Sequence, residues 1–193
     1  MVTPELTRKE MPASLRWIPT RLPRAWAAAY ATVWAATLGF AALVATAGPP
    51  LTTPIRRLLG LRLMASVNPP PGLSRVMALT AHNLPIAAWP ILLGVLGAHR
   101  HRLTIRIADT VLLGTLTANV LPVGAALGAY GTALLPYVPQ LPAEWAGLAL
   151  GSGAWVVQRK TPLTVKEGAV WLALTGYVLL CAAVFETFGV PHR

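Results

Sequence analysis

The chain has 193 residues, of which 55% are hydrophobic and only 11% are charged, and its mean hydropathy is +0.58. This balance excludes an ordinary water-soluble domain and favours lipid as the solvent of most side chains. The net charge of +10 does not indicate a nucleic-acid partner, because the basic residues lie mainly between apolar runs, as topology determinants do. The single cysteine, Cys181, excludes an intrachain disulfide, and we expect neither a metal site nor a cofactor.

The chain begins with a basic segment that leads into an apolar run. Residues 1–25 carry five basic side chains, and residues 26–47 then continue for 22 residues without a charge. A secretory signal peptide has a shorter apolar core, of about 7 to 15 residues. A Gly-Pro-Pro sequence at 48–50 ends the run. The pattern predicts a cytoplasmic N-terminal segment over 1–25 and a first transmembrane helix over 26–47.

The next segment, residues 51–75, mixes arginines with apolar side chains. On a 3.6-residue period the apolar side chains gather near one face, while Arg56 and Arg62 fall elsewhere. This pattern favours an amphipathic helix lying at the membrane interface, although a re-entrant element has similar composition. We therefore expect Arg56, Arg57 and Arg62 to bind anionic lipid headgroups or an acidic partner.

Four further apolar runs are long enough to suggest membrane crossings. They lie at 76–98, 107–135, 141–157 and 169–188. Prolines inside the first of them predict a kink. The 107–135 run is longer than one crossing needs, so it is either one long tilted helix or two pieces broken near Asn119 to Pro122. The predicted fold is an all-α polytopic transmembrane helix bundle of about five spans, in a single transmembrane domain over 26–190.

The distribution of basic residues predicts how such a bundle is oriented. With five spans, the N-terminal segment and the loops near 100 and 160 share one side, and these segments carry most of the Lys and Arg. Basic loops stay in the cytoplasm, so the N terminus is expected there. The arginines of 51–75 then lie on the opposite side.

Polar side chains inside apolar runs are candidate functional groups, because an unpaired polar group is costly in lipid. His82 and Asn83 are expected to face other helices, either as packing bonds or as the lining of a polar cavity. Glu144 either anchors a helix start at the interface or points inward as an acid–base group beside Asn119 or His82. Asp109 is expected to pair with Arg106, three residues earlier, although it is also a candidate acid–base group.

Two other features concern packing and the last span. The glycine pairs Gly124 with Gly128, and Gly147 with Gly151, have a spacing that allows two helices to approach closely. Close packing within the bundle is therefore expected. Glu186, near the end of the last span, is expected to be solvated.

Three short patterns follow one another between residues 79 and 158. The first is the pair His82-Asn83 at the start of a span, where the family named below has an asparagine pair. The second is an asparagine followed five residues later by a glycine, here Asn119 and Gly124. The third is a proline five residues before a glutamate at the head of a helix of small residues, ending here at Glu144. In order and spacing these patterns resemble the stage II sporulation protein M family of bacterial membrane proteins.

The resemblance covers roughly 80 of the 193 residues, and it has departures. Val120 replaces a glycine of the family pattern, and Gln140 and Leu141 stand where histidine and glycine are usual. What the resemblance implies is a multi-pass protein of the bacterial cytoplasmic membrane that works with other membrane proteins. The sporulation role itself is not implied, and related small proteins also look like permease-type subunits.

Three functions fit these features. The first is a non-catalytic membrane subunit that assembles with and supports a partner membrane protein. The second is a membrane enzyme subunit that modifies a peptide, by dehydration or epimerisation in peptide natural-product biosynthesis. It would use His82, Glu144 and Asp109 as acid–base groups, with Asn83 and Asn119 binding the substrate. The third is a permease-like transport subunit with a polar path along His82, Asn83, Asn119 and Glu144.

Overall fold

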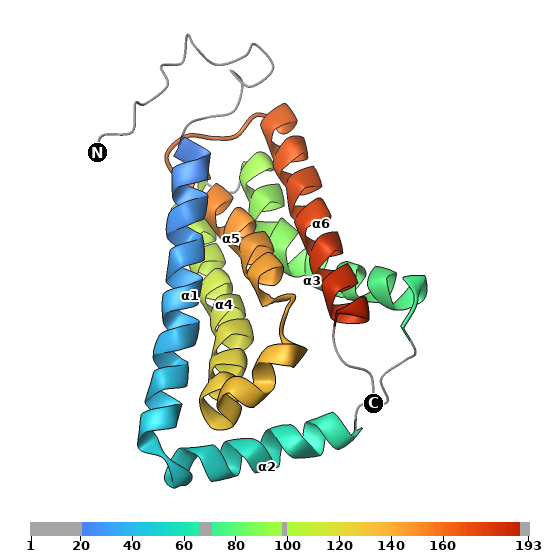
Figure 1. Cartoon of the computed structure of the whole chain (residues 1–193). Coiled ribbons are helices and arrows are strands. Elements are labelled where there is room, and N and C mark those ends of the chain that lie inside the picture. The colour runs from blue at the N-terminus through green and yellow to red at the C-terminus, as the bar shows by residue number, and fades with distance from the viewer. Residues whose placement is uncertain (1–20, 66–70, 98–99, 190–193) are drawn as a thin grey trace, which may run out of the picture.

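The computed structural model describes residues 21–65, 71–97 and 100–189 (Figure 1). Within these ranges the fold is all-α, with six α-helices and one short 3-10 helix. Most of the predicted N-terminal segment, residues 1–20, lies outside the described residues.

Every predicted span coincides with a helix, within about five residues at each end. The elements are α1 (Arg21–Ala47), α2 (Pro49–Ala65), α3 (Leu73–Val95), α4 (Arg102–Tyr130), η2 (Gly131–Tyr137), α5 (Leu141–Gln158) and α6 (Val165–Phe188). Four described stretches are long and apolar enough to cross a membrane: α1, α3, α4 continued to Pro136, and α6. The chain is therefore a multi-pass membrane protein by length and composition.

Helix α5 is not among these four, yet it is the most buried helix of the described chain. Figure 1 shows α5 inside the bundle, with α1 on one side and α3 and α6 on the other. Thirteen of its 18 residues are buried, and both apolar core clusters contain α5 side chains. Because protein rather than solvent surrounds it, α5 can carry glycine, serine and tryptophan where a lipid-facing helix carries leucine and valine.

Glycines set the distance between α5 and its neighbours. A Cβ atom at Gly151 would overlap the backbone carbonyl of Ala87 on α3, and one at Gly153 would lie 2.9 Å from the backbone nitrogen of Trp26 on α1. Gly128 on α4 lies against Ala41 on α1 in the same way. The close packing predicted from the glycine pairs is confirmed.

The first helix begins before its apolar run and ends at the predicted place. Arg21 and Arg24, predicted to belong to the N-terminal segment, lie in the first turns of α1, and the Arg21 guanidinium donates a 3.0 Å hydrogen bond to Thr161 Oγ1. At the other end Gly48 has a φ of 65°, a left-handed conformation that glycine adopts without strain. The chain therefore turns there, and α2 crosses beneath the ends of α1 and α4 (Figure 1).

Two alternatives were predicted for the 107–135 run. The break near Asn119 to Pro122 is wrong, because α4 is one continuous helix through Pro122. The chain leaves α4 at Gly131, where φ is 60°, and η2 follows. A proline removes one backbone donor but need not end a helix whose neighbours hold it in place. In contrast, α3 bends visibly along its length in Figure 1, as its internal Pro85 and Pro90 predict.

The packing of α5 predicts a specific effect of one added methyl group. Gly151→Ala should destabilise the bundle by about 1 to 3 kcal/mol, because the new Cβ must displace the α3 backbone at Ala87. Gly39→Ala is the matched control, since Gly39 is helical, exposed and has no atom within 4 Å of an added Cβ. Thermal unfolding of the purified protein in lipid nanodiscs measures both. Equal stability of the two variants would contradict this packing.

Candidate functional site

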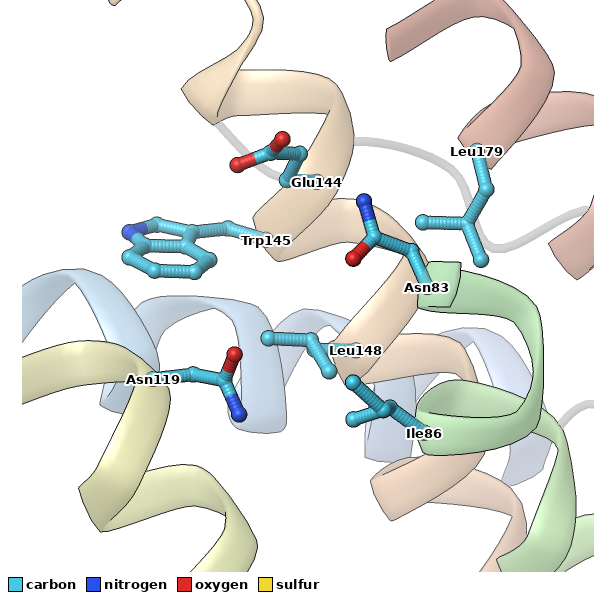
Figure 2. Close-up of a pocket in the computed structure, with 7 residues that line it drawn as sticks. All are labelled: Asn83, Ile86, Asn119, Glu144, Trp145, Leu148 and Leu179. Carbon is cyan, nitrogen blue, oxygen red and sulfur yellow. The ribbon is translucent and has the colours of Figure 1, made fainter. Parts of the chain in front are cut away.

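Three helices contribute polar side chains to one small cavity in the described part of the chain. Asn83 comes from α3, Asn119 from α4 and Glu144 from α5, and Figure 2 shows the three around a common space. The space available to a water-sized group is about 30 Å³. The remaining lining residues are apolar or aromatic: Ile86, Trp145, Leu148 and Leu179. The cavity is thus a polar spot in an otherwise apolar interior.

Glu144 reaches this cavity because α5 begins inside the bundle. In Figure 1 the chain climbs from η2 before α5 starts, above the level at which α1 and α4 end. Glu144 lies in the first turn of α5, where the helix dipole favours a carboxylate. The Glu144 side chain is half-buried and lines a cavity. Of the two predicted alternatives, an anchor at the interface or an inward-pointing group, the structure therefore has the second.

Asn119 uses one half of its amide locally. Its Nδ2 donates a 2.7 Å hydrogen bond to the Thr115 carbonyl, one turn earlier in α4. A carboxamide that donates to its own helix retains its carbonyl oxygen as an acceptor for another group. Asn119 therefore contributes a hydrogen-bond acceptor to the lining of the cavity, as Glu144 does.

His82 does not join this group. Its side chain is exposed, while the next residue, Asn83, is half-buried and lines the cavity. Consecutive residues of a helix point about 100° apart, so only one of the two faces the bundle. The expectation that His82 faces other helices is wrong.

Asp109 lies on another part of α4 and has other partners than predicted. Its Oδ1 accepts a 2.9 Å hydrogen bond from the indole Nε1 of Trp155, and its Oδ2 lies 3.4 Å from an Arg159 nitrogen. Both partners belong to the end of α5 or follow it directly. Asp109 therefore ties α4 to α5, and the ion pair that the structure gives it is with Arg159 instead of Arg106.

Glu186 is not a solvated end of α6. Its carboxylate lies 4.0 Å from an Arg75 nitrogen in the first turn of α3, and the two side chains are only 24% and 12% exposed. This ion pair joins the end of one helix to the start of another. The expectation of a solvated Glu186 is corrected accordingly.

The arginines of α2 have different surroundings. Arg56 donates from Nε to the Ala129 carbonyl at 2.7 Å and lies over the Tyr130 ring at 5.7 Å, so it satisfies a carbonyl in the last turn of α4. Arg57 is exposed. Arg62 lies in α2, but its side chain is outside the described residues. Of these three, Arg56 holds α2 on the bundle and Arg57 is available at the surface.

The partners Trp155, Tyr130 and Arg75 were not found by reading the sequence. Each bonds to a residue more than 40 positions away, so no local spacing predicts the pair. The available signal was general: charged groups inside a bundle pair with one another or with polar groups on facing helices.

Compared with protein-family models, with curated proteins and with solved structures, the chain gives no match. The resemblance to the stage II sporulation protein M family stays a prediction. What the structure adds is that the motif residues Asn83, Asn119 and Glu144 line one cavity.

The bond between Asp109 and Trp155 predicts a contrast between two variants of α4. Asp109→Ala should cost about 1 to 3 kcal/mol, because it leaves the fully buried indole N–H of Trp155 without an acceptor. Arg106→Ala should change stability by less than about 0.5 kcal/mol, since Arg106 is exposed. Thermal unfolding in nanodiscs distinguishes them. A local Asp109–Arg106 pair would instead make the two losses similar.

Proposed function

We propose that the chain is a non-catalytic multi-pass membrane subunit that assembles with a partner membrane protein in a hetero-oligomeric complex. The observation that carries this proposal is the open face of α4. Four small residues on it are exposed: Thr110, Gly114, Thr117 and Ala118. Their spacing puts them on one side of the helix, and no atom lies within 4 Å of a Cβ built at Gly114.

This face fits a transmembrane helix of another protein. Within lipid, helices associate through small residues that let their backbones approach, because apolar burial gives no driving force there. The bundle already uses the glycines of α5 and the later part of α4 in this way. The first part of α4 has an equivalent surface that no described helix covers.

The contacts of the acidic side chains also support a structural role. Asp109 holds α4 to α5, and Glu186 joins α6 to α3. Glu144 faces a cavity of about 30 Å³, which is room for about one water-sized group and far below the roughly 300 Å³ of a typical substrate pocket.

We further propose five crossings with a cytoplasmic N terminus in a bacterial cytoplasmic membrane. α5 rises about 27 Å over its 18 residues, close to the hydrocarbon thickness, and its neighbours shield it from lipid. Arg21, Arg100 and Lys160 then share one side, and α2 lies at the opposite interface with Arg57 toward the headgroups.

Single cysteines test this orientation in cells. In a Cys181→Ala background, a membrane-impermeant maleimide added outside should label Arg57→Cys but should label Arg100→Cys only after the membrane is opened. Both positions are exposed, so reactivity reports the side of the membrane. The reverse labelling pattern would overturn the proposed orientation.

Assembly is tested by one substitution on the open face of α4. Gly114→Leu should lower recovery of a stoichiometric partner from native membranes at least about tenfold, a loss of roughly 1.4 kcal/mol of association free energy. Ala173→Leu is the matched control on α6, because Ala173 is exposed among the bulky exposed side chains of Val170, Leu174 and Tyr177. Quantitative mass spectrometry of the purified tagged protein measures recovery, and thermal unfolding checks that both variants fold. Purification of the wild-type chain without a stoichiometric partner, or equal recovery from both variants, would contradict the proposal.

The enzyme subunit remains the second candidate, favoured by the convergence of Glu144 with Asn83 and Asn119. The same purified complex separates the two. If Glu144→Gln preserves assembly but abolishes a measurable turnover of a peptide, the non-catalytic proposal is wrong. A permease-like subunit, the third candidate, would instead require the complex to move a substrate across sealed vesicles.

A further inference from the structure

The polar cavity between α3, α4 and α5 presents mainly acceptors. Asn119 has already donated its amide nitrogen to Thr115, which leaves its Oδ1 for the cavity. An ionised Glu144 can only accept hydrogen bonds. Asn83 can turn either end of its amide inward, and in Figure 2 the Trp145 nitrogen lies on the side of the ring away from Asn83. The group that this wall suits best is therefore a cation.

The charges around the cavity also favour a positively charged occupant. Glu186 of α6 is paired with Arg75 of α3. The lining itself holds one carboxylate and no basic side chain. A carboxylate among apolar side chains is costly unless a positive charge compensates it. One positive charge, either a proton or a monovalent cation, balances this site.

The size of the cavity and the type of its ligands limit which cation can bind. The space of about 30 Å³ has room for a small ion. Carboxylate and amide oxygens are hard ligands, which suit hard cations and not soft transition metals. A divalent ion would need more than one negative charge to balance it, and the lining holds one carboxylate.

We propose that this cavity binds one sodium-sized monovalent cation, held by the Glu144 carboxylate and by the side-chain oxygens of Asn83 and Asn119. Such an ion joins α3, α4 and α5 where a polar side chain of each helix meets the same cavity. The inference goes beyond the proposed assembly with a partner and does not depend on it, since the three helices belong to this chain.

Equilibrium binding of radioactive sodium to the full-length protein in nanodiscs tests the proposal. Choline chloride keeps the ionic strength constant, because choline is a bulky quaternary ammonium and cannot replace a small ion held directly by oxygen atoms. The wild type should bind one sodium ion per chain in a saturable manner. Glu144→Gln, which keeps the shape and removes the charge, should weaken binding at least about tenfold. Asn119→Leu should weaken it as well.

The control is Glu167→Gln. Glu167 forms the N-terminal capping box of α6 with Thr164, and glutamine can also serve at this position, so the variant removes one carboxylate without touching the cavity. This variant should keep the wild-type affinity for sodium. Thermal unfolding in sodium-free buffer should show that Glu144→Gln folds at least as stably as the wild type, because it no longer buries an uncompensated charge.

Three results would overturn the inference. The first is no saturable sodium binding to the wild type. The second is wild-type affinity in both Glu144→Gln and Asn119→Leu. The third is stability that responds to pH but not to sodium, which would make a proton the occupant.

Discussion

The close approach of α5 to the backbones of its neighbours is the constraint on which the rest of this structure depends. Gly151 lies against the carbonyl of Ala87 on α3, and Gly153 lies against α1 near Trp26. The Trp26 indole adds a 3.3 Å hydrogen bond to the carbonyl of Ala146 on α5. In lipid there is no hydrophobic gain from bringing helices together, so contact area and interhelical hydrogen bonds must supply the stability. A central helix rich in small residues meets that requirement, because residues 147–155 of α5 are all buried.

The same constraint explains where polar groups are placed. With α5 enclosed, a polar side chain on it can meet a partner on another helix, as Trp155 meets Asp109 at 2.9 Å. Glu144 instead lies at the start of α5 beside a cavity shared with Asn83 and Asn119. The concentration of acceptors at this point is what motivates the proposed cation. The open face of α4 lies outside the enclosed region, which suits the proposed contact with another protein.

The sequence predicted the helices well, because apolar length and proline or glycine breaks are local signals. Even the 141–157 run was recognised as a helix, although α5 is not among the four described stretches that are long and apolar enough to cross a membrane. Pro122 was misleading: in isolation it suggests a broken helix, but packing of Gly124 and Gly128 against α1 holds α4 continuous through it. Side-chain partners were less predictable, because they depend on tertiary contacts. Asp109 pairs with Arg159 and not with Arg106, and Glu186 pairs with Arg75. Asn83, Asn119 and Glu144 were proposed as one polar path, and their shared cavity is consistent with that grouping, whereas His82 points out of it.

Labelling from the lipid phase tests the central position of α5 most directly. A small apolar carbene precursor, dissolved in the bilayer and activated by light, modifies side chains that face lipid. The account predicts modification of α4 and α6 at exposed residues such as Leu113 and Leu174, and little or none within residues 145–155 of α5. Mass spectrometry of peptides from the wild-type protein locates the modified residues. Labelling of α5 as heavy as that of α4 would contradict a bundle organised around an enclosed helix.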